Sequence, residues 1–533
     1  MYLSRPAINK YGGIRMKLNY KRTILVGFAF FLISAFWQAY DATIPVILTN
    51  KFGMSQAWSG VIMALDNVLA VFMLPLFGTL SDKCNTRFGK RTPFIVFGTI
   101  VAAVSLLCLS FVDSAQLKNI SAVSGIDDPA SMEVIYDSQA DATLLTPEGE
   151  TFVLSDVFER DEFVQIKSKV ENPDTGKMVT NPDYTSYVAP ARQAYAAEMT
   201  SANPSALITF VVLLFVILVA MATFRSPAVA LMPDVTVKPL RSKANAIINL
   251  MGTAGGILVL VLGMVFATSA VHNQLMNYTV YYGVVAGIML GALAIFLATV
   301  REPAWAKKMR EDSISFGLET AEETRSENHG KLGRGEKRSL LFILASIILW
   351  YFGYNAVTSK YAVYAGNILN MDYNTTLLLA QAAAIVAYLP AGMVASGIGR
   401  KKTILAGIIM LSTAFACASF MRAGSSVLLM NVLFALAGIG WATINVNSFP
   451  MVVEMCSGSD IGKYTGFYYT ASMSAQIVTP MLSGVLMDKM GMTILFPYAA
   501  IFAALAFVTM ALVRHGDAKV VSKKGLEAFD TDD

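Results

Sequence analysis

A polar, basic stretch near the start of the chain separates two long apolar runs. Residues 78–94 read Gly-Thr-Leu-Ser-Asp-Lys-Cys-Asn-Thr-Arg-Phe-Gly-Lys-Arg-Thr-Pro-Phe. The apolar runs beside it, 59–80 and 93–112, each come close to the roughly 20 residues that a helix needs to cross the hydrocarbon core of a bilayer. The stretch therefore predicts the aqueous turn between two membrane-spanning helices.

The composition of the whole chain supports a membrane protein. Its 533 residues are 55% hydrophobic and 15% charged, whereas soluble domains carry roughly 25% charged residues. The net charge of +4 is too small to indicate a nucleic-acid partner. Counting the two runs above, we predict twelve spans, at 23–47, 59–80, 93–112, 207–231, 244–268, 278–300, 339–358, 376–396, 403–421, 426–449, 464–487 and 493–513.

The distribution of basic residues predicts the orientation of these spans. With the amino terminus inside, 30 of the 41 Lys and Arg fall on the cytoplasmic side and 10 outside, six of them in one long segment that the positive-inside rule ignores. We therefore expect a multi-pass protein of the cell membrane with both termini in the cytoplasm. No cleavable signal peptide is expected, because the first apolar run is long enough to stay in the bilayer.

Two polar segments interrupt the spans. Residues 113–206 hold 16 acidic and 6 basic residues, which places them outside. Alternating apolar residues from Val164 to Val170, followed by a turn signal at 172–176, predict a strand and a hairpin in a small external α/β insertion. Residues 301–338 hold nine basic and eight acidic residues and fit a flexible cytoplasmic tether better than a regulatory site.

These interruptions divide the chain into three parts. Residues 1–300 form an amino-terminal bundle of six helices that carries the insertion, residues 301–338 form the linker, and residues 339–533 form a carboxy-terminal bundle of six helices with a cytoplasmic tail. The predicted fold is therefore an all-α membrane protein of twelve transmembrane helices in two six-helix bundles.

Two motifs stand out along the chain. The first, in the turn after span 2, comprises Gly78, Ser81, Asp82, Lys83, Arg87, Gly89, Lys90, Arg91, Thr92 and Pro93, and a weaker echo at 397–403 lacks the acid. The second comprises Arg225, Ser226, Pro227, Asp234, Arg241, Ala244, Asn245 and Ala246. The first motif resembles the signature loop of the major facilitator superfamily, and the second resembles the turn between helices 4 and 5 of sucrose transporters. Together they resemble the glycoside-pentoside-hexuronide cation symporters and their sucrose transporter relatives.

The resemblance implies the major facilitator fold and a gate on the inner side. In this family the loop after helix 2 locks one half against the other in the outward-open state. The plain alternative is that the basic residues only fix the topology, and both roles can hold together. The implied gating residues are Asp82, Arg87, Gly89, Lys90, Arg91, Asp234 and Arg241.

Three charged residues fall within the predicted spans: Asp41, Asp66 and Arg225. A charge at a helix centre costs about 2.5–3.5 kcal/mol on insertion scales, so a functional role is expected. A rise of 1.5 Å per residue puts Asp41 and Asp66 each about 9–10 Å from the outer ends of their helices. Two facing carboxylates in low dielectric need a cation or a shared proton, so we predict that this pair couples transport to a cation. The alternative is that one or both acids turn toward the external water near the helix ends.

Arg225 differs in its predicted depth. It should lie about 9 Å from the inner end of helix 4 and about 18 Å from the depth of Asp41, too far for an ion pair. It could reach the cytoplasmic surface or, as the sucrose transporter resemblance implies, line the inner cavity and engage substrate. Melibiose permease relatives place acids on helices 2 and 4, whereas helix 4 of this chain carries Arg225 instead.

A sugar could bind near the middle of the membrane. Trp37, Trp350 and Trp441 fall there, each with a polar or acidic residue four positions later, and sugars stack on aromatic rings while their hydroxyls bind amides and carboxylates. Ordinary packing between helices is the alternative. The predicted substrate-binding residues are Trp37, Gln38, Asp41, Arg225, Trp350, Tyr351, Tyr354, Asn355, Trp441 and Asn445.

The sequence therefore predicts a monomeric secondary transporter that takes up a glycoside or small oligosaccharide with a proton or sodium ion by alternating access. No enzymatic activity, cofactor, bound metal or nucleic-acid partner is expected. The alternatives are an exporter of drugs or lipids, which would favour an apolar cavity, and a receptor or enzyme that works through the insertion.

Overall fold

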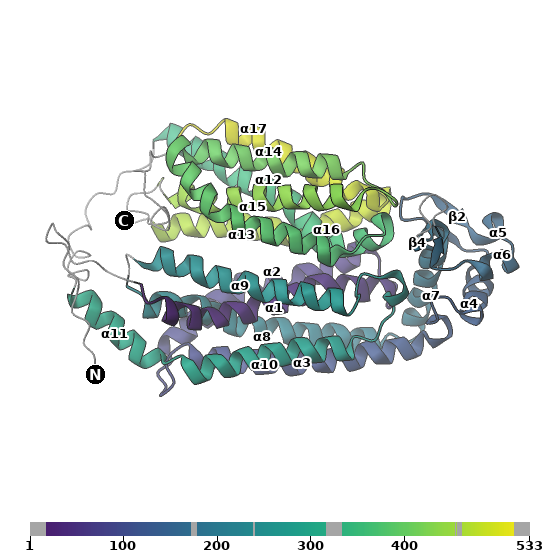
Figure 1. Ribbon diagram of the computed structural model, residues 1–533, viewed down its shortest axis with the longest axis horizontal. Coiled ribbons are helices and arrows are strands. Elements are labelled where there is room, and N and C mark those ends of the chain that lie inside the picture. Colours follow the sequence, from purple (N-terminus) through teal and green to yellow (C-terminus); the bar gives the residue numbers. More distant parts are fainter. Residues whose placement is uncertain are drawn as a thin grey trace.

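The chain folds into two helical halves that lie side by side, with the insertion at one end (Figure 1). The computed structural model describes residues 18–171, 178–237, 240–315, 333–453, 455 and 461–515. We call the end that carries the insertion the insertion end. The opposite end, where α1 begins and the turn between α2 and α3 lies, is the terminus end.

All twelve predicted apolar segments are helices. By length and hydropathy, ten helices in the described part of the chain could cross a membrane, and α13 and α16 are not among the ten. The amino-terminal half contains α1 (Tyr20–Asn50), α2 (Gln56–Lys83), α3 (Thr92–Asn119), α8 (Ser205–Val235), α9 (Arg241–Val265) and α10 (Thr279–Thr299). The carboxy-terminal half contains α12 (Arg334–Tyr364), α13 (Tyr373–Ile398), α14 (Arg400–Ala418), α15 (Val427–Val453), α16 (Ile461–Met490) and α17 (Leu495–Ala511).

Local chemistry fixes where several helices begin. The side chain of Ser55 accepts a hydrogen bond from the backbone N–H of Trp58 and caps α2. Asp372 caps α13 by accepting from the N–H groups of Asn374 and Thr375. Such caps satisfy backbone donors that have no partner within the helix.

The insertion has its own hydrophobic core, which includes Phe163 and Tyr184. Its helices and strands confirm the predicted small α/β insertion. Its main elements are α4 (Pro129–Gln139), α5 (Leu154–Val157), α6 (Arg160–Gln165), α7 (Ala189–Ala202) and two antiparallel hairpins, β1 (Thr143–Leu145) with β2 (Thr151–Val153) and β3 (Lys169–Glu171) with β4 (Met178–Thr180).

Two details of the polar segments differ from the prediction. The strand predicted from Val164 begins only at Lys169, because Phe163 and Val164 are both buried and consecutive buried positions suit the helix α6; the turn signal at 172–176 lies outside the described residues. The expected tether begins with a helix, α11 (Glu302–Ser315), which packs against α8. Residues 316–332 of the linker lie outside the described part.

The two halves meet closely at the insertion end. Helix α2 packs against α16, and α9 packs against α13. A Cβ atom added at Gly60 would lie 2.1 Å from the carbonyl oxygen of Pro480, and one added at Gly484 would lie 2.3 Å from that of Gln56. The backbones of α2 and α16 are therefore in direct contact where the two helices cross.

Hydrogen bonds reinforce this contact. Asp488 of α16 accepts from the backbone N–H groups of Gln56 (2.8 Å) and Ala57 (2.7 Å) at the start of α2. The buried Lys360 Nζ of α12 donates to the Gln56 carbonyl oxygen at 2.6 Å. On the other side Ser269 Oγ donates to Asp372 Oδ1 at 2.6 Å. The structure is thus closed between the halves at the insertion end.

Candidate functional site

A polar cavity of about 200 Å³ lies between the two halves. It brings together the three charged residues that the sequence placed within the spans: Asp41 from α1, Asp66 from α2 and Arg225 from α8. Helices α12 and α16 of the other half complete the wall. The other lining residues are Trp37, Met63, Asn67, Asn355, Thr358, Ser359, Gln476 and Pro480.

Asp41 and Asp66 lie at similar depths. Asp41 is nine residues from the end of α1 at Asn50, and Asp66 is ten residues from the start of α2 at Gln56. The helical rise makes these separations about 14 and 15 Å. The two carboxylates interact electrostatically and both face the cavity, so they do not turn toward bulk water at the helix ends.

Arg225 lines the same cavity as the two acids. It lies ten residues, about 15 Å, before the end of α8 at Val235. Its guanidinium lies 5.8 Å from the centre of the Trp37 ring and interacts electrostatically with Asp66. Within the described residues, no salt bridge joins Arg225 to Asp41 or Asp66, so the arginine remains available to a ligand.

Two hydrogen-bond donors in the cavity wall are buried without a partner in the described structure. They are Trp37 Nε1 and Asn355 Nδ2, one from each half. A buried donor left unsatisfied costs about 1–3 kcal/mol. Both residues line the cavity, but a ligand that carries hydroxyl oxygens would reach the two donors only after the atoms that now cover them moved aside.

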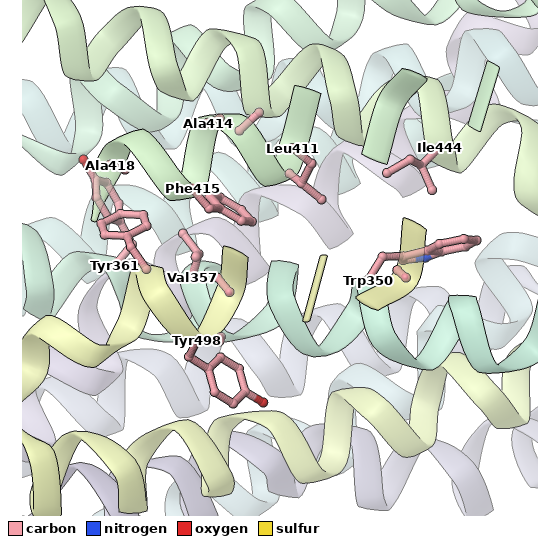
Figure 2. Packing of buried hydrophobic residues seen from close by; sticks show 14 of the residues in the cluster. Trp350, Val357, Tyr361, Leu411, Ala414, Phe415, Ala418, Ile444 and Tyr498 are labelled. Atoms are coloured by element: carbon pink, nitrogen blue, oxygen red, sulfur yellow. The ribbon is translucent and has the colours of Figure 1, made fainter. Parts of the chain in front are cut away.

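Six of the ten predicted substrate-binding residues do not line the cavity, and two of these six, Trp350 and Gln38, have other roles. Trp350 is 1% exposed and packs in the core of its half near Leu411 and Ile444 (Figure 2). Gln38 accepts a hydrogen bond from Gln381 Nε2 of α13 at 2.5 Å, so it joins the two halves.

The remaining predicted residues form an aromatic cluster beside the cavity. The Trp441 ring stacks on Tyr354 with centroids 3.7 Å apart and meets Tyr351 edge-on at 5.2 Å. Asn445 forms a side-chain hydrogen bond with Tyr388. Tyr354 interacts electrostatically with Asp41, so this cluster adjoins the cavity without lining it.

Sequence reasoning missed four polar residues of the wall: Asn67, Thr358, Ser359 and Gln476. Two of them carried a signal. Asn67 follows Asp66 directly, and Ser359 lies four residues after Asn355, on the same helix face. Gln476 is a single amide on α16, where spacing gave no indication of its role.

The loop at the terminus end is organised around Arg91. Its guanidinium binds Asp82 of α2, donates to Asp234 of α8 at 2.7 Å and donates to Ser81 Oγ at 2.5 Å. The Arg91 side chain is 7% exposed, and these partners belong to its own half. In this structure the loop thus holds α2, α3 and α8 of one half together.

Glu302, a residue assigned to the tether by sequence, caps the start of α3. Its carboxylate accepts from the backbone N–H groups of Lys90 (2.6 Å), Arg91 (2.9 Å) and Thr92 (2.8 Å), and from Thr92 Oγ at 2.7 Å. A Cβ atom at Gly89, whose φ is +114°, would lie 2.2 Å from the Glu302 Cδ. Glycine is therefore required there.

The predicted gating residue Arg87 makes a contact outside this network. The Arg87 guanidinium lies over the ring of exposed Phe88, 4.7 Å from its centre. Arg241 begins α9, and its side chain lies outside the described part of the structure.

We expect Glu302→Ala to destabilise the protein by about 2–3 kcal/mol, because it removes four hydrogen bonds to a buried carboxylate. Thermal unfolding in detergent measures the loss. Glu311→Ala is the matched control, since Glu311 is an exposed acid of the same helix whose partner Lys307 lies 4.0 Å away. Equal melting temperatures for the two variants would contradict the capping role.

Family models cover most of the chain. The model described as Major Facilitator Superfamily matches residues 189–389 and 373–529. A second model, described as MFS/sugar transport protein, matches residues 25–117. Residues 118–188, which make up most of the insertion, lie outside both matches.

Curated relatives align over shorter stretches. The MFS-type transporter ppzB of Metarhizium rileyi is 26% identical over 198 residues, which is 35% of this chain and 40% of that protein. The sucrose transport protein SUC4 of Arabidopsis thaliana is 34% identical over 74 residues, 14% of each chain. The matched part of the chain thus spans less than half the length of either relative.

Solved structures share the fold over nearly the whole chain. The inward open xylose transporter XylE from E. coli superposes with a TM-score of 0.54 at 15% sequence identity. The superposition covers 96% of this chain and 99% of that one. It confirms the predicted arrangement of two six-helix bundles.

Proposed function

Because the chain belongs to the major facilitator superfamily, we propose that it is a secondary active transporter that moves a sugar or glycoside together with a proton or a sodium ion by alternating access. We further propose that the insertion end faces outward, since the excess of Lys and Arg lies on the opposite side. The family consists of transporters, so the insertion is an addition to a transporter rather than an enzyme.

The observation that carries this proposal is the shared cavity of Asp41, Asp66 and Arg225 between the halves. With one arginine and two carboxylates, the site holds one more negative than positive charge when all three are ionised. A bound proton or sodium ion balances that excess. In low dielectric this balance favours binding the cation and opposes leaving the pair charged and empty.

The wall of the cavity supports a hydroxyl-rich ligand. Asn67, Thr358 and Gln476 add amide and hydroxyl groups to the unpartnered donors of Trp37 and Asn355. Hydrogen-bond donors and acceptors around one aromatic ring suit a sugar. An exporter of apolar drugs or lipids would leave these polar groups unsatisfied, and the names of the sucrose transporter relative and of the sugar family model point the same way.

The experiment that tests this function measures uptake into right-side-out vesicles with an imposed proton or sodium gradient. Radiolabelled sucrose, xylose and melibiose serve as probes. One cation falling through 100 mV supplies about 2.3 kcal/mol, enough for roughly fortyfold accumulation of a neutral sugar. The proposal is supported if a sugar accumulates and this accumulation is lost when one of the two gradients is removed. It is contradicted if the flux of every probe is independent of both gradients.

We expect Asn355→Ala to raise the KM for the transported sugar about threefold to tenfold, because one neutral hydrogen bond contributes about 0.5–1.5 kcal/mol. Initial uptake rates over a range of sugar concentrations give the KM. Trp350→Phe is the comparison: Trp350 lies on the same helix but packs in the core, so it should change stability and leave the KM within twofold. If Trp350→Phe raised the KM and Asn355→Ala left it unchanged, Trp350 would be a binding residue after all.

A further inference from the structure

The turn between β1 and β2 of the insertion contacts the opposite half of the protein. The backbone N–H of Met492 donates to the carbonyl oxygen of Pro147 at 2.7 Å. Met492 begins the short 3-10 segment that links α16 to α17. The insertion, which belongs to the amino-terminal half by sequence, therefore reaches the carboxy-terminal half.

The fit at this contact depends on two glycines. Gly149 in the turn and Gly491 after α16 have φ angles of +99° and +83°, a region that favours glycine. A Cβ atom at Gly491 would lie 2.0 Å from the carbonyl oxygen of Glu148, and one at Gly149 would lie 2.8 Å from the Gly491 nitrogen. The two backbones touch, and no side chain fits between them.

The insertion is firmly joined to its own half. Gln193 Nε2 donates to Asn50 Oδ1 at the end of α1 (2.9 Å), and Gln116 Nε2 of α3 donates to Thr200 Oγ1 of α7 (3.0 Å). A Cβ atom at Gly53 would lie 2.3 Å from the Ala197 nitrogen of α7. The insertion should therefore move with the amino-terminal half when the halves move apart.

The turn itself is held in shape by its own hydrogen bonds. The Thr146 N–H donates to the Glu150 carbonyl oxygen at 2.8 Å, and the Gly149 N–H donates to the Thr146 carbonyl oxygen at 2.9 Å. A turn closed in this way presents Pro147 and Gly149 at fixed positions. It can therefore act as a rigid contact point.

Its partner lies next to the contact that closes the insertion end. Gly491 follows Asp488 by three residues, and Asp488 holds the start of α2 through Gln56 and Ala57. Opening this end moves α16 away from α2 and must also separate Gly491 from the turn. We propose that residues 146–150 are a latch that docks on residues 490–492 and stabilises the state closed at the insertion end. This proposal rests on the alternating access proposed above.

The test measures how often the insertion end opens. In a variant with Cys84, Cys108, Cys417 and Cys456 replaced by serine, Thr358→Cys places a thiol in the cavity wall. A membrane-impermeant maleimide added outside right-side-out vesicles reaches it only through the insertion end. We expect Gly491→Ala to speed labelling about fivefold to tenfold, the effect of losing roughly one hydrogen bond and its close packing.

Gly424→Ala is the matched control. Gly424 lies between α14 and α15 with a φ of +82°, and a Cβ atom there would meet nothing within 4 Å. Both substitutions place a Cβ atom on a residue with nearly the same positive φ, but only the one at Gly491 disturbs the contact. The proposal is overturned if the Gly491→Ala and Gly424→Ala variants are labelled at the same rate while both proteins elute as folded, monodisperse peaks.

A second pair of variants tests the same contact in the opposite direction. Glu148→Cys with Met490→Cys, two exposed positions beside the two glycines, should be joined by a short thiol-specific cross-linker that reduction cleaves. The cross-link should lower maleimide labelling at position 358 at least fivefold, and reduction should restore it. Labelling that proceeds unchanged through the cross-linked protein would also overturn the latch. Because neither readout needs a substrate, the latch and the sugar transport proposed above can fail independently.

Discussion

Asp41→Asn should abolish uphill uptake, lowering the accumulation ratio from roughly forty to about one, while exchange of substrate across the membrane continues. Asparagine keeps the size of the side chain but carries no charge to attract a cation and takes up no proton at the pH of the assay. Asp41 lines the cavity with Asp66 and Arg225, so its loss leaves one carboxylate facing one guanidinium. That pair is already balanced and has no need of a cation.

The measurement compares gradient-driven accumulation with counterflow in the same vesicles. Asp137→Asn is the control, because Asp137 is an exposed acid of the insertion that pairs with Arg160, and both accumulation and counterflow should match the unmodified protein. Normal accumulation by a variant with asparagine at both Asp41 and Asp66 would show that the coupling site lies elsewhere.

Lys51→Met should destabilise the protein by about 3–5 kcal/mol, because it leaves a buried carboxylate without its counter-charge. Lys51 Nζ donates to both oxygens of Asp113 (2.6 and 2.7 Å) and to the Met276 carbonyl oxygen (2.8 Å). Both charged side chains are completely buried. The pair ties the end of α1 to α3 and to the segment before α10.

The combined variant Lys51→Met with Asp113→Leu should recover much of this loss, since replacing a buried pair by apolar residues is often neutral. Thermal unfolding in detergent provides the measurement for both variants. Arg160→Met provides an exposed comparison in the insertion, where little change is expected. A Lys51→Met protein that unfolds at the original temperature would show that the pair contributes nothing to stability.

The fold was largely predictable from the sequence because each membrane-spanning helix corresponds to a long run of apolar residues. All twelve segments were located, and the loop at Asp82–Pro93 indicated the superfamily. Errors arose at helix ends, where polar residues belong to the helix but not to the apolar run. Asp113 and Lys360 therefore escaped the list of charges within spans, although both are buried in α3 and α12.

The candidate site was partly predictable for a similar reason. A charge in an apolar run is conspicuous, so Asp41, Asp66 and Arg225 could be selected from sequence, and the structure groups them around one cavity. The face of each helix depends on packing against other helices, which no single run reveals. Trp350 therefore looked equivalent to Trp37 by depth, yet it packs in the core.

Where α2 crosses α16, Gly60 and Gly484 bring main chain against main chain. Surfaces built from small residues associate through shape and backbone proximity, with little interlocking of large apolar groups. Separating such surfaces exposes only a modest apolar area. The closed arrangement therefore need not be much lower in free energy than the open one. The transport cycle proposed above opens this contact on every turnover, and a contact that separates at low cost in free energy favours that cycle.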